Sequence, residues 1–217
     1  MLVSIVIPTL KTPDGIVGQL NEIRSKKTNF EYELFAGSHT PLSAAGNRNW
    51  CLDRSKGDIV IMMDDDMKGF YDNWVDDLIT PLIEGKDKYN IMSARLLQKN
   101  GQVGPQLGNN GKYEAHGDME VAIHCEATGL NIVGSACISF FREDGIRFDE
   151  HYRGSTYEDT DFCMEYNKQF PNRKVFINNK CRIIHLGEGK GRGSKRGLRD
   201  NWKFNKEYFA NKWKVTV

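Results

Sequence analysis

The chain has 217 residues, of which 39% are hydrophobic and 27% are charged, and its 30 Lys and Arg stand against 29 Asp and Glu. This composition is typical of a globular protein and excludes disordered, collagen-like and coiled-coil chains. A net charge of +1 gives no overall field that would attract nucleic acid or an anionic membrane, and the length favours one large domain with a packed core.

The first half of the chain alternates between strand and helix patterns. An apolar run at Val3–Ile7 that stops at Pro8 predicts a strand buried on both faces, as in parallel sheets. The elements expected after it are a helix around Ile16–Ile23, a strand at Tyr32–Ala36, a helix from about Leu42 to Arg54, a strand at Asp58–Met63 and a helix around Trp74–Leu82. This order predicts an α/β fold.

The second half has a mixed pattern without an internal repeat or a long linker. We expect strands at Ile91–Leu97, Met119–Cys125 and Ile132–Phe141, a helix at Tyr157–Phe170, short strands at Lys174–Ile177 and Arg182–Leu186, a basic glycine-rich loop at Gly187–Leu198 and an aromatic helix up to Trp213. A single domain in two halves, about 1–95 and about 96–190, is therefore favoured, with the basic loop and C-terminal helix at 190–217.

The cysteines and the N-terminus indicate the compartment. Five cysteines without a C-x-x-C pair favour reduced thiols. The apolar run at the N-terminus ends at Pro8, too early for a signal peptide or a membrane span. We expect a cytoplasmic protein that meets any membrane-borne substrate peripherally.

Three consecutive aspartates, Asp64, Asp65 and Asp66, follow the predicted strand at Asp58–Met63. They stand at the carboxyl end of this strand, the edge where open α/β sheets bind ligands. Alternate residues of an extended chain point to the same side, so Asp64 and Asp66 can share a divalent cation. Like charges this close are costly without a cation, so the cluster predicts a metal site, with a solvated turn as the alternative.

Two helices carry further polar candidates. On the helix ending at Arg54, a helical wheel places Asn49 inside the apolar stripe and Arg48 at its edge. The alternative to a functional role is that Asn49 bridges buried backbone and that Arg48 is an ordinary surface residue. Glu158, Asp159 and Asp161 open a later helix, with Thr156 as its N-cap. The helix dipole alone favours such acids, and it also keeps a carboxylate ionised, which suits a general base.

His185 ends a predicted strand and precedes the glycine-rich loop, which carries Lys190 and Arg192. Such a loop is flexible enough to close over phosphates as a lid. A structural histidine and a solvated loop are the alternatives.

In this order, the segments resemble the GT-A-fold glycosyltransferases of family 2, a group of mostly inverting nucleotide-sugar enzymes. The likeness runs from Ser4 to about Gly189. The segments that carry it are the opening strand Ser4–Leu10, the Asn47-Arg48-Asn49 helix motif, the GDIVIMMDDD strand with its D-x-D motif at Gly57–Asp66, the turn segment Leu96–Gly108, the acceptor-side segment Gly134–Glu150, the YEDTDF helix start at Tyr157–Phe162 and the closing strand Ile183–His185.

The resemblance implies a single GT-A domain, with a Rossmann-like nucleotide-binding half at about 1–95, an acceptor-binding half at about 96–190 and a mixed central sheet flanked by helices. It implies that Asp66 and His185 hold Mn²⁺ or Mg²⁺ on the diphosphate. It also implies that Asp64, which the strand geometry adds to the metal site, approaches the nucleoside and ribose. The imidazole ligand favours Mn²⁺. Asp159 would be the acceptor-activating base, with Asp161 or Glu158 as substitutes. Donor contacts are implied for Pro8, Thr9, Arg48, Asp64, Asp65, Lys190 and Arg192.

The implied function is a metal-dependent inverting glycosyltransferase, with a UDP-sugar as donor, UDP-glucose by default, and a glycan or glycoconjugate as acceptor. One departure from the family is the end of the second strand, where the usual acidic pair that reads uracil is replaced by Ala36–His39.

Two alternatives remain open. A nucleotidyltransferase can share this fold and metal chemistry, but Pro8–Gly15 lacks a glycine-rich phosphate loop. A nucleic-acid-binding module would use Lys190–Lys214 with its aromatic residues Trp202, Phe204, Tyr208 and Trp213. The net charge near zero speaks against it.

Overall fold

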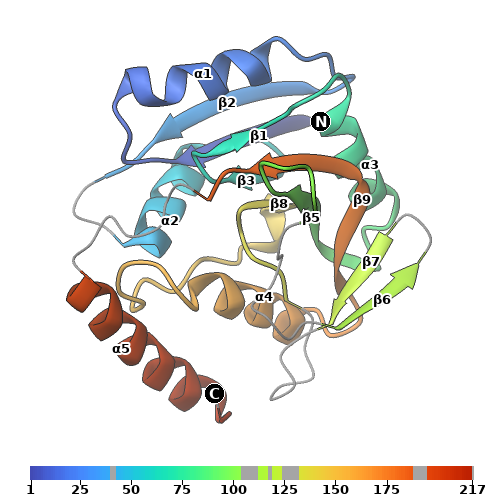
Figure 1. The fold of residues 1–217 in the computed structure, drawn as a ribbon. Helices are drawn as coiled ribbons and strands as arrows, with labels where there is room; N and C mark the ends of the chain where they lie inside the picture. Colours follow the sequence, from blue (N-terminus) through green and yellow to red (C-terminus); the bar gives the residue numbers. More distant parts are fainter. Residues whose placement is uncertain (40–42, 104–111, 117–118, 124–131, 188–194, 217) are drawn as a thin grey trace.

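The computed structural model describes residues 1–217 except 40–42, 104–111, 117–118, 124–131, 188–194 and 217. Within the described residues, nine strands form one mixed sheet in the order β2-β1-β3-β8-β5-β9-β7-β6, with β4 paired to β9 (Figure 1). The strands are β1 (Leu2–Pro8), β2 (Glu31–Gly37), β3 (Ile59–Met63), β4 (Met67–Lys68), β5 (Tyr89–Leu97), β6 (Lys112–His116), β7 (Met119–Ile123), β8 (Cys137–Phe141) and β9 (Lys174–His185).

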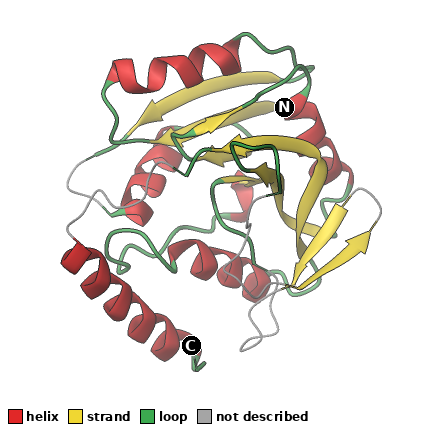
Figure 2. Cartoon of the chain, viewed as in Figure 1, coloured by secondary structure: helices red, strands yellow, loops and turns green. Residues whose placement is uncertain are grey.

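Helices cover both faces of this sheet (Figure 2). They are α1 (Pro13–Arg24), α2 (Ala44–Arg54), α3 (Trp74–Glu84), α4 (Glu158–Gln169) and α5 (Lys195–Trp213), with a short 3-10 helix at Arg142–Asp144. One core lies between the sheet and α1 and α3, and the other lies between the sheet and α2, α4 and α5. In β1, Ile5 and Ile7 belong to the first core and Val6 to the second, so this strand is buried on both faces, as predicted.

The strand directions place the site. β1 is parallel to both β2 and β3, whereas β8 runs antiparallel between β3 and β5. The chain passes from β1 to β2 on one side and then crosses to β3 on the other. The carboxyl ends of β1 and β3 therefore form the switch point at which such sheets bind ligands.

The predicted α/β class and mixed sheet are confirmed, and several local predictions are wrong. β8 begins at Cys137 rather than Ile132, and β9 is one continuous strand. Its polar middle contains a bulge, where the register with β5 shifts between Ala94 and Arg95. The N-cap of α4 is Tyr157 rather than Thr156, and it makes no side-chain capping bond.

The described cysteines, Cys51, Cys137, Cys163 and Cys181, are all buried free thiols. In the part of the chain that the structure describes, no helix combines the length and apolar character that crossing a bilayer requires.

Candidate active site

Side chains at the ends of β1 and β3 tie these two strands together. The hydroxyl of Thr9 donates a hydrogen bond to the carboxylate of Asp65, and Lys11 Nζ lies 3.4 Å from Asp65 Oδ1. Asp65 therefore bonds to two residues that follow β1, and one of them, Thr9, is like Asp65 a predicted donor contact.

Gln19 of α1 fixes the backbone of the aspartate turn. Its Nε2 donates to the carbonyl oxygen of Asp64 at 3.0 Å, and its Oε1 accepts from the Met67 amide at 3.3 Å. Sequence reasoning missed this residue. Its signal was a polar side chain three residues after Ile16, on the face that α1 buries.

β4 brings His185 to the aspartate turn because Met67 pairs with His185 across the antiparallel β4–β9 ladder. His185 Nε2 lies 3.2 Å from Asp66 Oδ1 and 3.7 Å from Asp64 Oδ2. One ligand atom from each of the three side chains falls within 4.8 Å of the others. The predicted grouping of Asp64, Asp66 and His185 is thus present, and Asp65 lies outside it.

The electrostatics of this triad fit a cation. The hydrogen bond to Asp66 raises the pKa of His185, and burial raises the pKa of Asp64 although Arg48 and His185 oppose the shift. Two carboxylates and one imidazole form a donor set that suits Mn²⁺, and the carboxylates alone also suit Mg²⁺. The residues present therefore fit the implied metal.

Arg48 of α2 is buried beside the triad. Its Nη1 lies 2.7 Å from Glu158 Oε1, and its Nη2 lies 3.5 Å from Asp64 Oδ1. The guanidinium also lies over the ring of Phe148, 5.3 Å from its centroid. This arginine thus connects Asp64 of the triad to the start of α4. The surface position that the helical wheel left open for Arg48 is wrong, because the side chain is buried.

The neighbouring residue Asn49 bonds to the segment that precedes α4. The side chain donates to the carbonyl of Phe148 and to Glu150 Oε1, both at 2.8 Å, and accepts from the Phe148 amide at 3.0 Å. Asn49 therefore holds the segment before α4 against α2.

The first two carboxylates of α4 differ in exposure. Glu158 is 3% exposed and paired with Arg48, whereas Asp159 is partly exposed and accepts a hydrogen bond from the Thr160 amide. Burial and the charge of Glu158 raise the pKa of Asp159 to about 6, against Arg48 and two backbone amides. This pKa lies near the range that suits a general base, and at neutral pH the carboxylate is still mostly ionised.

Asp161 belongs to the contact between α4 and α5. It is fully buried and accepts hydrogen bonds from Tyr152 Oη at 3.0 Å, Lys212 Nζ at 2.9 Å and Trp213 Nε1 at 2.7 Å. Three donors thus occupy its carboxylate. The predicted donor residues Lys190 and Arg192, and most of the predicted lid, lie outside the described residues. The last part of the predicted loop, up to Leu198, is wrong because α5 already begins at Lys195.

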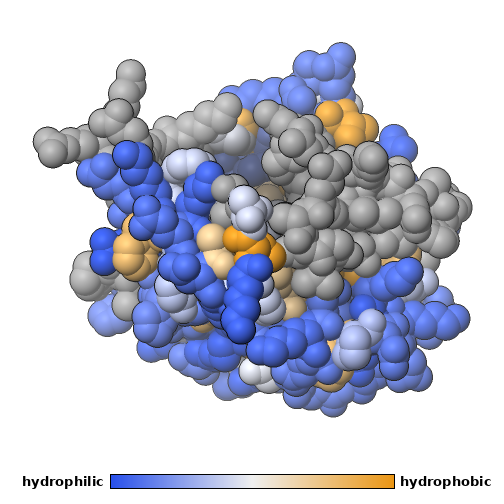
Figure 3. Space-filling view, turned by 90° about the horizontal axis from the view of Figure 1, so that it is seen from below, coloured by the Kyte–Doolittle hydropathy of each residue, from blue (hydrophilic) through white to orange (hydrophobic). Residues whose placement is uncertain are grey.

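Three of the four aromatic residues named for a nucleic-acid-binding module are engaged within the domain, whereas the fourth, Trp202, is 44% exposed. Tyr208 donates to Asp149 at 2.8 Å and Trp213 donates to Asp161, so both rings are engaged with the domain. Arg153 covers Phe204, with its guanidinium 3.6 Å from the ring centroid. Among the described residues on the face seen in Figure 3, hydrophilic ones predominate, and a small group of hydrophobic ones lies near the centre.

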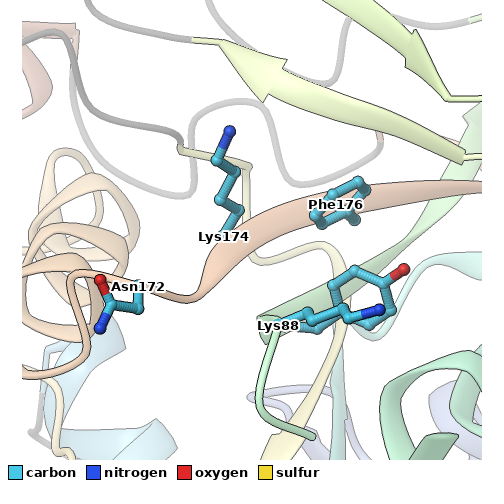
Figure 4. A pocket seen from close by; sticks show the side chains of 5 residues that line it. Lys88, Asn172, Lys174 and Phe176 are labelled. Carbon is cyan, nitrogen blue, oxygen red and sulfur yellow. The ribbon is translucent and has the colours of Figure 1, made fainter. Parts of the chain in front are cut away.

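A separate pocket of about 290 Å³ is lined by Lys88, Tyr89, Asn172, Lys174 and Phe176. It lies where β5 and β9 begin, at the opposite end of β9 from His185. In Figure 4 the side chains of Lys88 and Lys174 point in different directions. The pocket is therefore neither part of the carboxylate site nor a convergent anion site.

No protein-family model and no curated protein matches the chain. Among solved structures, it is similar to GalNAc-T7 with UDP, GalNAc and Mn²⁺, with a TM-score of 0.64 and 10% identity over 95% of this chain and 47% of that chain. It is also similar to S. aureus TarS 1-349 in complex with UDP-GlcNAc, with a TM-score of 0.61 and 13% identity over 97% of this chain and 67% of that chain.

A third similar structure is S. aureus TarS, with a TM-score of 0.59 and 14% identity over 97% of this chain and 40% of that chain. The chain thus spans about half the length of the GalNAc-T7 chain and less than half of that TarS chain. These likenesses establish the fold: the chain adopts the GT-A fold that the sequence resemblance implied.

Proposed function

We propose that this chain is a metal-dependent glycosyltransferase domain that moves a sugar from a UDP-sugar to a hydroxyl of a glycan or glycoconjugate, with inversion. The observation that carries the proposal is the arrangement around Arg48, which connects the Asp64, Asp66 and His185 triad to the carboxylates that open α4. On a GT-A fold, this arrangement would supply a metal site and a base within one centre.

Asp64, Asp66 and His185 would hold the cation. When bound, a divalent ion neutralises the charge that grows on the leaving diphosphate. On the protein side, Gln19 and the β4–β9 pairing keep the ligands in place. Pro8, Thr9 and Asp65 would contact the donor at the switch point, Arg48 would support it through Asp64, and Lys190 and Arg192 would contact the phosphates.

Asp159 would accept the proton of the attacking hydroxyl. With a pKa of about 6, it is mostly ionised at neutral pH and close to the value that favours general-base catalysis. One carboxylate acting in a direct displacement gives inversion at the anomeric carbon. Glu158 positions Arg48, and Asp161 has no catalytic role in this proposal because three donors already occupy it.

UDP is the proposed nucleotide because several of the similar structures contain UDP or UDP-GlcNAc. The sugar is tested with a panel that contains UDP-glucose, UDP-GlcNAc and UDP-GalNAc. We expect donor turnover with Mn²⁺ and none with chelator, and an inverted anomer in the product by NMR. Full turnover in chelator would exclude the metal-dependent mechanism.

The nucleotidyltransferase alternative is separated by its by-product. A glycosyltransferase releases the nucleoside diphosphate, whereas a nucleotidyltransferase releases pyrophosphate from a nucleoside triphosphate. We expect UDP release that depends on acceptor and no pyrophosphate release from UTP and sugar phosphate. Asp159→Asn should lower transfer by about a hundredfold or more with donor and Mn²⁺ affinity little changed.

A further inference from the structure

The chain enters α4 through a strained turn at residues 153–157. Within it, Gly154 has φ 63°, Thr156 has φ 150° and Tyr157 has φ 68°. Residues other than glycine rarely adopt positive φ, and such strain persists only where the surrounding structure imposes it. Because Glu158 and Asp159 follow immediately, the shape of the 153–157 turn sets the position of both carboxylates.

Asn205 of α5 holds this turn. Its Oδ1 accepts from the Arg153 amide at 2.8 Å, and its Nδ2 donates to the carbonyl of Arg153 at 2.9 Å and to both the carbonyl and the hydroxyl of Thr156 at 3.0 Å. The side chain is fully buried. Both polar atoms of the Asn205 side chain are therefore hydrogen-bonded to backbone and side-chain atoms of the turn.

Two further contacts connect the turn to the site. The amide of Ala44, at the start of α2, donates to the carbonyl of Gly154 at 2.8 Å. The amide of Thr156 donates to Glu158, the residue that pairs with Arg48. The turn thus lies between α2, α4 and α5, and a shift in it would reach Asp159.

We propose that Asn205 is a positioning residue for sugar transfer: from the C-terminal helix, it holds the strained 153–157 turn that aims Asp159 at the acceptor. The proposal rests on the proposed function, in which Asp159 is the base. It makes α5 a part of the catalytic unit as well as a cover for the core.

The other anchors of α5 supply a matched control. Tyr208 donates to Asp149 at 2.8 Å, one helical turn after Asn205, and does not bond to the turn. Tyr208→Phe therefore loosens α5 from the domain without removing a bond to residues 153–156. Asn205→Ala removes all four bonds to Arg153 and Thr156.

The test compares both variants of the full chain with Mn²⁺, the best UDP-sugar and saturating acceptor. Asn205→Ala should lower kcat by about 10- to 100-fold, the scale of small misplacements of a reacting group. Donor KM and Mn²⁺ affinity should change less than twofold, and Tyr208→Phe should keep kcat within twofold. If Asn205→Ala does not fold, Asn205→Ser, which is too short for all four contacts, replaces it.

A rescue experiment tests the strain itself. Glycine adopts a positive φ without a steric cost, so adding Thr156→Gly to Asn205→Ala should restore kcat several-fold. Absence of rescue would overturn the proposal, as would a wild-type kcat in Asn205→Ala or an equal loss in Tyr208→Phe.

Hydrogen exchange separates this proposal from the proposed function. Amides of residues 153–160 should lose protection in Asn205→Ala and keep it in Tyr208→Phe, whether or not sugar is transferred. If the wild type transfers no sugar, the proposed function fails while the exchange data still decide whether Asn205 holds the turn. Unchanged protection in Asn205→Ala would overturn the holding role directly.

Discussion

The buried arginine Arg48 lies between carboxylates from two distant parts of the chain, Asp64 and Glu158. The helical wheel left its burial open because a buried cation is tolerated only beside paired acids. Local periodicity does not reveal which acids a distant segment will supply. The same limit explains why Asn205 was missed, since its partners lie in the 153–157 turn.

The Arg48–Glu158 pair predicts a specific pattern of stabilities. Both side chains are nearly buried, with 10% and 4% exposure, so Arg48→Met should lower the free energy of unfolding by about 3–5 kcal/mol, the cost of leaving a buried charge unpaired. Adding Glu158→Gln should recover more than half of this loss, because both partners are then neutral. Urea unfolding of the wild type, both single variants and the double variant measures the coupling; losses that simply add would contradict the pairing.

The pKa of Asp159 predicts the acid side of the activity profile. Burial and Glu158 raise this pKa to about 6, and only the ionised form accepts a proton. At saturating Mn²⁺, kcat/KM should therefore be level above pH 7 and fall tenfold per pH unit well below pH 6. Glu158→Gln removes a negative charge and should move this limb to lower pH; an unchanged limb would place the titrating group elsewhere.

Among the helices and strands, those with simple periodicity were predicted well. β3 is an uninterrupted apolar run and α3 buries Trp74, Leu78, Ile79 and Leu82 on one face. β9 was divided into two because its polar middle resembles a turn. There Asn178 is buried and donates to the carbonyl of Asp77 at 2.6 Å, a tertiary contact that no local pattern indicates.

The contact between α4 and α5 predicts opposite behaviour for two neighbouring aspartates. Asp161→Asn weakens the bonds from Lys212 and Trp213, and should cost about 2–4 kcal/mol of stability while kcat changes less than threefold. Asp159→Asn should instead abolish transfer without comparable destabilisation. Denaturant unfolding and kcat for both variants decide this, and a hundredfold loss of kcat in folded Asp161→Asn would restore it as a candidate base.

The whole molecule assembles the site from segments that only the sheet order brings together. The motif order predicted that Asp64, Asp66 and His185 share a metal, and their ligand atoms do lie together. It did not predict Gln19, because α1 reaches the aspartate turn only once β1 and β3 are neighbours. Sequence motifs thus identified the three side chains that the structure brings together, whereas the residues that position them depend on tertiary structure.

Because the side chains of the triad come from the turn after β3 and from the end of β9, metal and nucleotide should stabilise the whole domain. A ligand that binds only the folded state at a hundred times its Kd adds about 2.7 kcal/mol, which raises Tm by about 5–10 °C in a domain of this size. We expect such a rise with Mn²⁺ and UDP together and a much smaller one with UDP in chelator. Asp66→Asn should remove the Mn²⁺-dependent part, whereas Asp87→Asn, an exposed acid after α3, should keep it. Differential scanning fluorimetry measures these shifts, and a full Mn²⁺-dependent rise in Asp66→Asn would show that the cation binds outside the triad.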